Sequence, residues 1–323
     1  MTSEALVYKD PPPLEFTAPV ALTSGEVFQL PDGRAAVVAG LAGFAAGDWA
    51  CAYVQGIYSV QKTASIALLK GGKVYWDRSA NKAHFRPQSG DFFLGTVVAD
   101  AAGTDTTVDV DINVVPQYAI NLDGAPSGTR WTEAITGAGQ GLVTEATMVQ
   151  YTTLSCDNGD EVAMAAIYPT DVRDHIPVAD GPIFEARVAI PDIGDDGQLN
   201  INVGLANGTH ATDADAITES VFIHFDGSAL DILAESDDGT TEVAATDTTI
   251  DALADNTIFE IWIDCRDLTD IQIYIDGVNV LPASVFKLNA ATGPVFPIAH
   301  IEKTGSTTTC EVWIEWMRVR TCD

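Results

Sequence analysis

The sequence predicts an all-β protein with two folding units, a small one followed by a larger antiparallel two-sheet β-sandwich. Short runs of alternating or β-branched residues recur along the chain and are separated by Gly, Asp, Asn and Pro, while apolar residues at helical spacing are nearly absent. The length of 323 residues exceeds that of a typical single domain. Apolar residues make up 46% and charged residues 19% of the chain, which is typical of globular proteins.

The first third of the chain contains many short expected strands, each bounded by a turn signal. Pro31-Asp32-Gly33 and Gly71-Gly72 are two of these turns. Short strands at this spacing indicate a small β-barrel-like domain or a small sandwich. The expected strands cover residues 14–20, 25–30, 34–39, 49–61, 73–76, 81–86, 92–99 and 106–113.

The rest of the chain is expected to form a linker and then the larger sandwich. Pro116 lies in a short junction at 114–118 and indicates a domain boundary, and residues 124–141 are rich in glycine and threonine. Strands are expected at 182–190, 199–206, 220–225, 229–234, 257–265, 270–275 and 310–320. The predicted organisation is an extended arm at 1–13, a small β-domain at 14–113, a linker or loop segment at 114–144 and a sandwich at 145–323.

The negative charge is concentrated in the second part of the chain. The formal net charge is −30, and residues 1–113 carry 8 Lys and Arg against 12 Asp and Glu, whereas residues 114–323 carry 8 against 34. Such a surface repels phosphate backbones and anionic lipid head groups, so neither nucleic acid nor a membrane is an expected partner. The simplest interpretation of the charge is that it keeps the protein soluble.

The sequence shows no membrane-spanning or secretory segment. No apolar run approaches the roughly 20 residues that cross a bilayer. The opening residues, MTSEALVYKDPPPLEF, lack the basic flank and the apolar stretch of a signal peptide. The chain is therefore expected to be made in the cytoplasm and kept there until lysis.

The candidate metal ligands do not form a recognisable motif. Five widely spaced cysteines lack a C-x-x-C pair and are expected to be reduced, mostly buried thiols. The five histidines show no i,i+2 or i,i+4 pairing, so zinc is not expected. Aspartate clusters could offer oxygen ligands to calcium, but none fits the EF-hand pattern, and Asp is also a preferred turn residue. No metal and no cofactor are predicted. These aspartates are Asp192, Asp195 and Asp196, the pair Asp213 and Asp215, and the pair Asp237 and Asp238.

Six short motifs follow one another in the first third of the chain. They are LEFTAP at 14–19, SGEV at 24–27, GIYSV at 56–60, GKVYWD at 72–77, FLGTVV at 93–98 and TVDVDI at 107–112. In this order they resemble the phage capsid cement, or head decoration, protein family, up to about residue 113. The resemblance implies a small β-barrel-like, capsid-binding decoration domain on the outside of an assembled phage head. It also implies a homotrimer, the major capsid protein as partner, and assembly in the host cytoplasm onto the outer surface of the virion.

Three consecutive prolines lie in the expected N-terminal arm. They favour the extended polyproline II conformation, which loses little conformational entropy on docking. We therefore expect the arm to contact the capsid, although an ordinary disordered chain end is the alternative. The residues expected to touch the capsid are Tyr8, Lys9, Asp10, Pro11, Pro12 and Pro13.

The second part of the chain contains a further set of strand motifs. They are FEARV at 184–188, NVGLA at 202–206, IFEIWID at 258–264, IQIYIDG at 271–277 and EWMRVR at 315–320. Together they resemble the concanavalin-like lectin and glucanase jelly roll, over residues 145–323. Sandwiches of this kind include glycosidases, lectins and structural modules, so the resemblance implies a fold and no activity.

Strand alternation gathers carboxylates and tryptophans on one face of two expected strands. Such a face is what a sugar-binding sheet presents, so these residues are candidates for glycan binding. On the last strand, Trp316 is expected on the opposite face with Val312 and Ile314. The candidates are Glu260, Trp262 and Asp264 on the first strand and Glu311, Trp313 and Glu315 on the second.

Catalysis is not expected from these carboxylates. Residues four apart on one strand lie about 13 Å from each other, beyond the roughly 5 to 9.5 Å of a glycosidase pair. The E-x-D-x-x-E strand of glucanases is missing, as are G-x-S-x-G, Walker and dinucleotide-binding motifs. Two hypotheses follow: a structural head decoration protein, which is not an enzyme, or a virion-surface module that binds host or environmental glycans and, less favoured, cleaves them.

Overall fold

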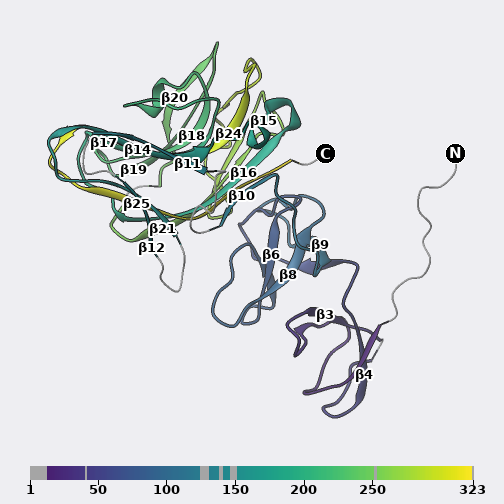
Figure 1. The fold of residues 1–323 in the computed structure, drawn as a ribbon. Coiled ribbons are helices and arrows are strands. Elements are labelled where there is room, and N and C mark those ends of the chain that lie inside the picture. The colour runs from purple at the N-terminus through teal and green to yellow at the C-terminus, as the bar shows by residue number, and fades with distance from the viewer. Residues whose placement is uncertain are drawn as a thin grey trace. The chain divides into compact units, whose positions relative to one another are not determined.

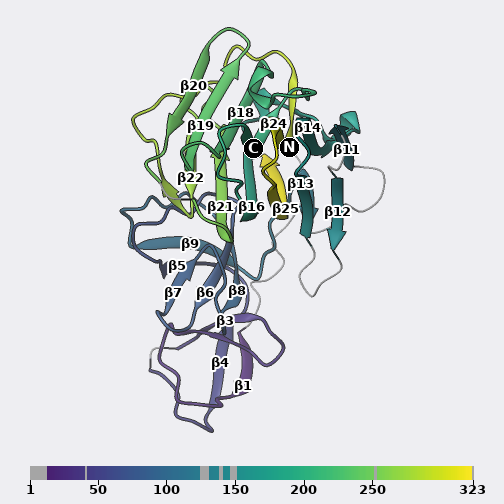
Figure 2. The same cartoon turned by 90° about the vertical axis from the view of Figure 1, so that its left-hand side faces the viewer.

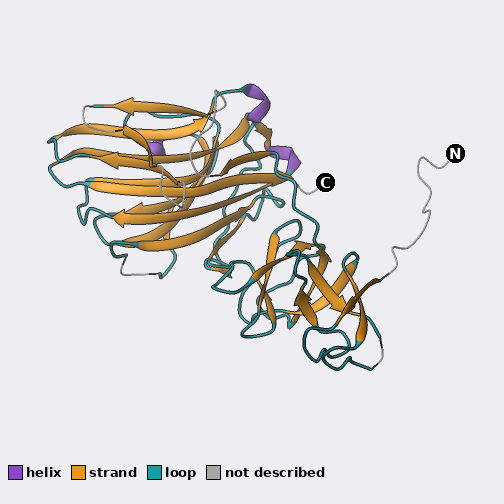
Figure 3. Cartoon of the chain, turned by 60° about the horizontal axis from the view of Figure 1, so that its bottom comes forward, coloured by secondary structure: helices purple, strands orange, loops and turns teal. Residues whose placement is uncertain are grey.

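The computed structural model describes residues 13–40, 42–123, 131–137, 141–145, 151–250 and 253–321. Strands dominate these ranges, and the helices within them are three short 3-10 turns, which confirms the all-β prediction (Figure 3). The chain forms two compact units, unit 1 (Met1–Gln117) and unit 2 (Tyr118–Asp323), each with its own sheets (Figure 1). Within the described ranges, none of the helices has the length and apolar character needed to span a lipid bilayer. The helical turns are η1 (Val172–Asp174), η2 (Val178–Asp180) and η3 (Ala214–Ala216).

Unit 1 contains two small antiparallel sheets. The strands of the first are β1 (Leu14–Thr17), β2 (Val27–Gln29), β3 (Ala35–Val38) and β4 (Trp49–Tyr53), in the order β1-β4-β3-β2. The strands of the second are β5 (Ile57–Gln61), β6 (Lys73–Asp77), β7 (Lys82–His84), β8 (Phe92–Val97) and β9 (Thr107–Ile112), in the order β5-β9-β8-β6-β7. The single strand expected over 49–61 is therefore wrong. Gly56, with φ of +114°, interrupts it and sends β4 and β5 into different sheets.

Asn113 connects the two sheets of unit 1. Its backbone has φ of +61°, a left-handed conformation that asparagine tolerates better than most residues. Its side-chain Oδ1 accepts a hydrogen bond from the N–H of Ala35 at 2.9 Å, and its Nδ2 donates to the carbonyls of Ala35 at 2.9 Å and Val54 at 2.8 Å. Because Ala35 begins β3 and Asn113 follows β9, this one amide joins strands of both sheets.

Replacing Asn113 by alanine should lower the free energy of unfolding of unit 1 by about 2 kcal/mol, because backbone groups of Ala35 and Val54 lose their partners. Urea denaturation followed by tryptophan fluorescence measures the loss. Asn81→Ala is the matched control, since Asn81 also has a positive φ, of +53°, and is exposed. Equal losses in the two variants would show that the side-chain hydrogen bonds of Asn113 contribute nothing.

Unit 2 is a sandwich of two eight-stranded sheets, as the sequence predicts (Figure 2). We call them the β25 sheet, in the order β12-β13-β25-β16-β21-β22-β23 with β10 also paired to β25, and the β24 sheet, in the order β11-β14-β24-β17-β18-β19-β20 with β15 also paired to β24. Every pairing within both sheets is antiparallel. The strands are β10 (Ile120–Asp123), β11 (Trp131–Thr136), β12 (Gly141–Glu145), β13 (Tyr151–Cys156), β14 (Glu161–Pro169), β15 (Ile176–Pro177), β16 (Pro182–Asp192), β17 (Leu199–Ala206), β18 (Glu219–Asp226), β19 (Asp231–Asp238), β20 (Glu242–Asp247), β21 (Thr257–Asp264), β22 (Gln272–Ile275), β23 (Val278–Asn279), β24 (Pro294–Ser306) and β25 (Cys310–Thr321).

The apolar core of unit 2 lies between its two sheets. Ile261 and Ile263 of β21 are fully buried there, and so are Ile201 and Val203 of β17 in the other sheet. Alternation along each strand turns the intervening residues to the outer faces. The two outer faces are therefore where polar groups of unit 2 gather.

Residues 114–144, expected to be a linker, contribute three strands to unit 2. β10 pairs with β25, β11 with β14, and β12 with β13. The linker prediction is therefore wrong at 120–123, 131–136 and 141–144. The glycine- and threonine-rich composition favoured a loop, but strand formation here depends on pairing with segments distant in the sequence, which composition does not reveal.

Candidate functional site

A row of buried polar side chains crosses the outer face of the β24 sheet. Asn202 on β17 lies opposite His300 on β24 and also opposite His224 on β18. Glu302 lies two residues beyond His300 on β24, and Glu235 comes from β19, beside β18. All five side chains, which we call the polar row, belong to residues that are at most 9% exposed.

The loop between β17 and β18 folds over the polar row. At η3 the backbone N–H of Ala214 donates to Oε2 of Glu302 at 2.8 Å, and Nε2 of His300 donates to the carbonyl of His210 at 3.3 Å. Ala214 and Ile217 are also buried in an apolar cluster on the same face of the sheet. Polar and apolar contacts thus hold this loop, and η3 within it, against the outer face.

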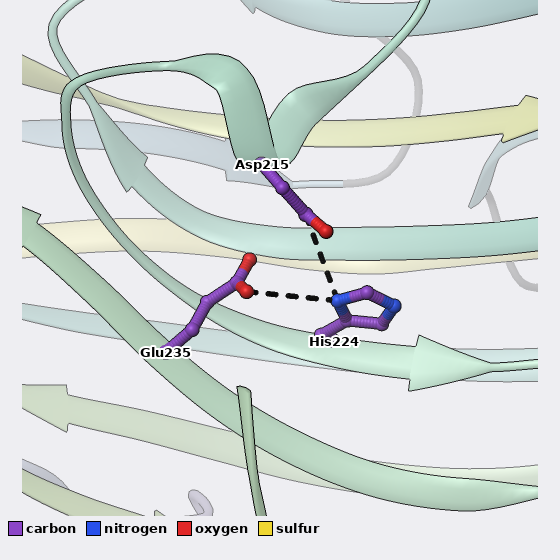
Figure 4. Close-up of side chains that lie close together, drawn as sticks. All are labelled: Asp215, His224 and Glu235. Atoms are coloured by element: carbon purple, nitrogen blue, oxygen red, sulfur yellow. Dashed lines mark ion pairs between the residues drawn. The ribbon is translucent and has the colours of Figure 1, made fainter. Parts of the chain in front are cut away.

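The side chain of Asp215, from η3, approaches His224 and Glu235 of the polar row (Figure 4). Nδ1 of His224 lies 3.6 Å from Oδ1 of Asp215 and 3.8 Å from Oε2 of Glu235. Both distances exceed the roughly 2.7 to 3.2 Å of a hydrogen bond. One ring nitrogen and two carboxylates therefore converge from three separate elements, and we call them the Asp215 cluster.

Several atoms of this region are buried without a hydrogen-bond partner among the described residues. They are both ring nitrogens of His224, Nδ1 of His300, Oε1 of Glu235 and Oδ1 of Asn202. A buried polar group left without a partner costs about 1 to 3 kcal/mol. The fold therefore holds these unpaired groups at a cost in stability, which is typical of ligand-binding sites.

The electrostatics of the Asp215 cluster raise the pKa values of Glu235 and His224. Burial raises the pKa of Glu235 to about 7, and the negative charge of Asp215 adds to the rise. Burial alone would lower the pKa of His224, but the carboxylates of Glu235 and Asp215 outweigh it and raise that pKa. The carboxylates of Asp215 and Glu235 repel each other, so the cluster favours a positive charge between them, either a proton on His224 or a metal cation.

Glu260, Trp262 and Asp264 share the outer face of the other sheet, the β25 sheet, but they are only 5 to 6% exposed. Asp264 accepts a hydrogen bond from Nε of Arg266 at 2.8 Å. Trp262 packs beside Tyr274, with ring centroids 5.9 Å apart. Asp264 and Trp262 are thus engaged with neighbouring side chains.

Glu311, Trp313 and Glu315 lie on the same outer face, separated from β21 by β16. Nε1 of Trp313 donates to Glu311 at 2.6 Å, and Glu315 pairs with Arg187 at 3.1 Å. The prediction for Trp316 is wrong, because a β-bulge beside Arg187 shifts the register and turns Trp316 to the outer face. There, Cζ of Arg318 lies 4.4 Å from the centroid of the Trp316 ring. Two half-buried rings, Trp313 and Tyr151, stack on each other with centroids 4.2 Å apart.

Unit 1 exposes large aromatic side chains on β4. Trp49 is 68% exposed and Tyr53 is 39% exposed, whereas Ala50 and Ala52 between them are buried. Tyr58 of β5 lies near Tyr53, with ring centroids 6.4 Å apart. Exposed tryptophan and tyrosine side chains are typical of protein-binding surfaces.

The expected arm contacts Tyr8, Lys9, Asp10, Pro11 and Pro12 lie outside the described residues, and Pro13 directly precedes β1. The Asp215 cluster contains only one residue that the sequence singled out, Asp215 itself. His224 and Glu235 were missed because they lie eleven residues apart on neighbouring strands. Alternation along the strand expected at 220–225 is the signal that could have found His224, whereas Glu235 lies one residue beyond the strand expected at 229–234.

Several solved structures are similar to this chain at low identity. A structure from work on endo-acting O-glycanases of human gut microbiota is 10% identical, with a TM-score of 0.46, covering 64% of this chain and 100% of its own. A family 16 endo-glucanase from Bacteroides ovatus is 10% identical, with a TM-score of 0.45, covering 62% and 99%. The carbohydrate recognition domain of Emp47p is 10% identical, with a TM-score of 0.43, covering 64% and 96%.

A family match covers the first third of the chain. No curated protein matches the sequence. The matched segment, residues 9–112, takes in every strand of unit 1 from β1 to β9. The resemblance expected from the six short motifs is thereby confirmed over nearly the same residues. Through this segment, the chain is similar to the family described as phage cement protein.

Proposed function

We propose that the chain is a head decoration protein that binds the outer surface of a phage capsid through unit 1 and displays the acidic unit 2. The observation that carries the proposal is the match of residues 9–112 to the phage cement family, because that segment makes up nearly all of unit 1. A role of this kind is structural and needs no catalytic centre. It would place the protein on the outside of the virion.

The capsid contacts are proposed to come from the arm at Tyr8 to Pro13 and from the exposed aromatic pair on β4. Trp49 and Tyr53 offer a large apolar area that unit 1 leaves open. Buried aromatic anchors of this kind contribute about 2 kcal/mol or more to protein interfaces. The major capsid protein is the proposed partner. Copies of the chain are proposed to associate as trimers, and light scattering on the purified chain tests this oligomeric state.

Sedimentation with undecorated phage heads tests the proposal. The full chain is expected to pellet with the heads, and a chain lacking residues 1–113 is expected to stay in the supernatant. Trp49→Ala should weaken head binding at least tenfold, since a central aromatic anchor is lost. Val172→Ala is the control, because Val172 is 77% exposed on unit 2. Head binding by the shortened chain at the level of the full chain would overturn the proposal.

A second candidate function is glycan binding at the outer face of the β25 sheet. The stacked pair of Trp313 and Tyr151, with Glu311 hydrogen-bonded beside it, is the observation that favours it. Aromatic faces with adjacent carboxylates suit sugar rings and their hydroxyl groups. A glycan array with the full chain and with Trp313→Ala separates the two functions. A sugar-dependent signal that Trp313→Ala leaves unchanged would remove this site.

A further inference from the structure

The Asp215 cluster belongs to unit 2, outside the unit proposed to bind phage heads. We propose that it binds a first-row divalent transition-metal ion, and Zn²⁺ is the ion chosen for the test. Its donors are a carboxylate oxygen of Asp215, Nδ1 of His224 and a carboxylate oxygen of Glu235. An imidazole nitrogen with two carboxylates is a donor set that zinc and its neighbours accept, whereas calcium takes oxygen ligands alone.

The spacing of the donors fits a metal better than it fits direct hydrogen bonds. Three donors about 2.0 to 2.2 Å from one tetrahedral Zn²⁺ lie about 3.3 to 3.6 Å from one another. Nδ1 of His224 is 3.6 Å from Asp215 and 3.8 Å from Glu235, and all three donor atoms lie within 4.8 Å of one another. Shifts of a few tenths of an ångström would bring all three to bonding distance of one ion.

His224 supplies an observation independent of the carboxylates. It is 5% exposed, and its Nδ1, which points between Asp215 and Glu235, has no hydrogen-bond partner among the described residues (Figure 4). Oε1 of Glu235 is likewise buried without one. A metal ion would coordinate Nδ1 of His224 and neutralise the carboxylates of Asp215 and Glu235 at once. No side chain among the described residues does both.

Neighbouring residues hold the ligands in position. Nδ2 of Asn202 donates to Oδ1 of Asp215 at 2.7 Å, and the side chain of Asp213 caps η3 by accepting from the N–H of Asp215. Such outer hydrogen bonds orient metal ligands. The side chain of Asp215 is 39% exposed, so an ion could enter from solvent on that side, and a coordination position would remain open to water.

Isothermal titration of the chelator-treated full chain with ZnCl₂ tests the proposal, with Co²⁺ absorption as a second readout of the coordination sphere. We expect one saturable Zn²⁺ site per chain. Affinity should fall at least tenfold in Glu235→Gln, which keeps the side-chain shape, and in His224→Gln. Glu242→Gln is the control, because Glu242 is an exposed carboxylate on the neighbouring β20.

Circular dichroism shows whether each variant is folded, and a folded Glu235→Gln is sufficient for the comparison. Unchanged Zn²⁺ affinity in folded Glu235→Gln would overturn the site. The absence of saturable Zn²⁺ binding to the unaltered chain would overturn it too, and would leave a proton on His224 as the positive charge between the two carboxylates. Neither outcome bears on head binding, so the metal site and the decoration role can fail independently.

Discussion

Replacing Lys303 by methionine is expected to lower the free energy of unfolding of unit 2 by about 3 to 4 kcal/mol. Lys303 is fully buried on β24, and its Nζ donates to the carbonyl of Asp157 at 2.7 Å, to that of Ser306 at 3.3 Å and to that of Gly159. Methionine keeps the apolar stem but has no donor. The three carbonyls then lose this donor; that of Gly159 keeps the N–H of Glu161, and a buried acceptor left unpaired costs about 1 to 3 kcal/mol.

Urea denaturation of the full chain, followed by tryptophan fluorescence, measures this loss. Lys287→Met is the control within the same unit, because Lys287 is only half-buried and its loss should change the free energy of unfolding by less than about 1 kcal/mol. If the two variants lose stability equally, the ammonium group of Lys303 does not hold the 157–159 turn against β24.

Replacing Gly204 by alanine should cost unit 2 about 3 kcal/mol or more. A Cβ at Gly204 would lie 2.1 Å from the carbonyl oxygen of Val221 and 3.0 Å from Cα of Phe222, both on the neighbouring strand β18. Backbone atoms cannot move aside for the added Cβ as the end of a flexible side chain can. The strands β17 and β18 would therefore have to separate. His224 is on the same strand as these atoms, so the Asp215 cluster should loosen as well.

The control for Gly204→Ala is Gly208→Ala, since a Cβ at Gly208 would meet no atom within 4 Å. Thermal unfolding measures the difference in stability, and amide hydrogen exchange along β17 and β18 locates it. Similar unfolding temperatures for the two variants would contradict the close approach of the strands at Gly204.

The all-β class and the sandwich of unit 2 could be predicted because alternation is visible in single strands. On β21, Ile261 and Ile263 lie in the core while Glu260 and Trp262 turn outward, as the pattern predicts. Unit 1 could be anticipated in the same way, since its strands are short and its turns carry glycine. These features depend on neighbours in the sequence.

Features that depend on distant pairing could not be predicted. β24 was missed, because a thirteen-residue strand that buries Lys303, Glu302 and His300 does not alternate like a half-exposed strand. The strands within 114–144 were missed because composition favoured a loop there. Trp316 was placed on the wrong face because a bulge, which adds one residue to a strand, reverses the parity of everything beyond it.

The Asp215 cluster illustrates the same limit. A search for histidines paired along one strand or helix finds nothing, because the three donors come from one loop and two strands. Register between β18 and β19 and the fold of the loop over the sheet decide whether they meet. Neither is visible in residue spacing.

β1 has a mechanical consequence. It is an edge strand of its sheet, and its four residues pair with β4 alone. A pulling force applied at Leu14 would therefore act first on the β1–β4 hydrogen bonds. Peeling β1 from β4 would be the first mechanical failure of unit 1, and it would leave the β5-β9-β8-β6-β7 sheet paired.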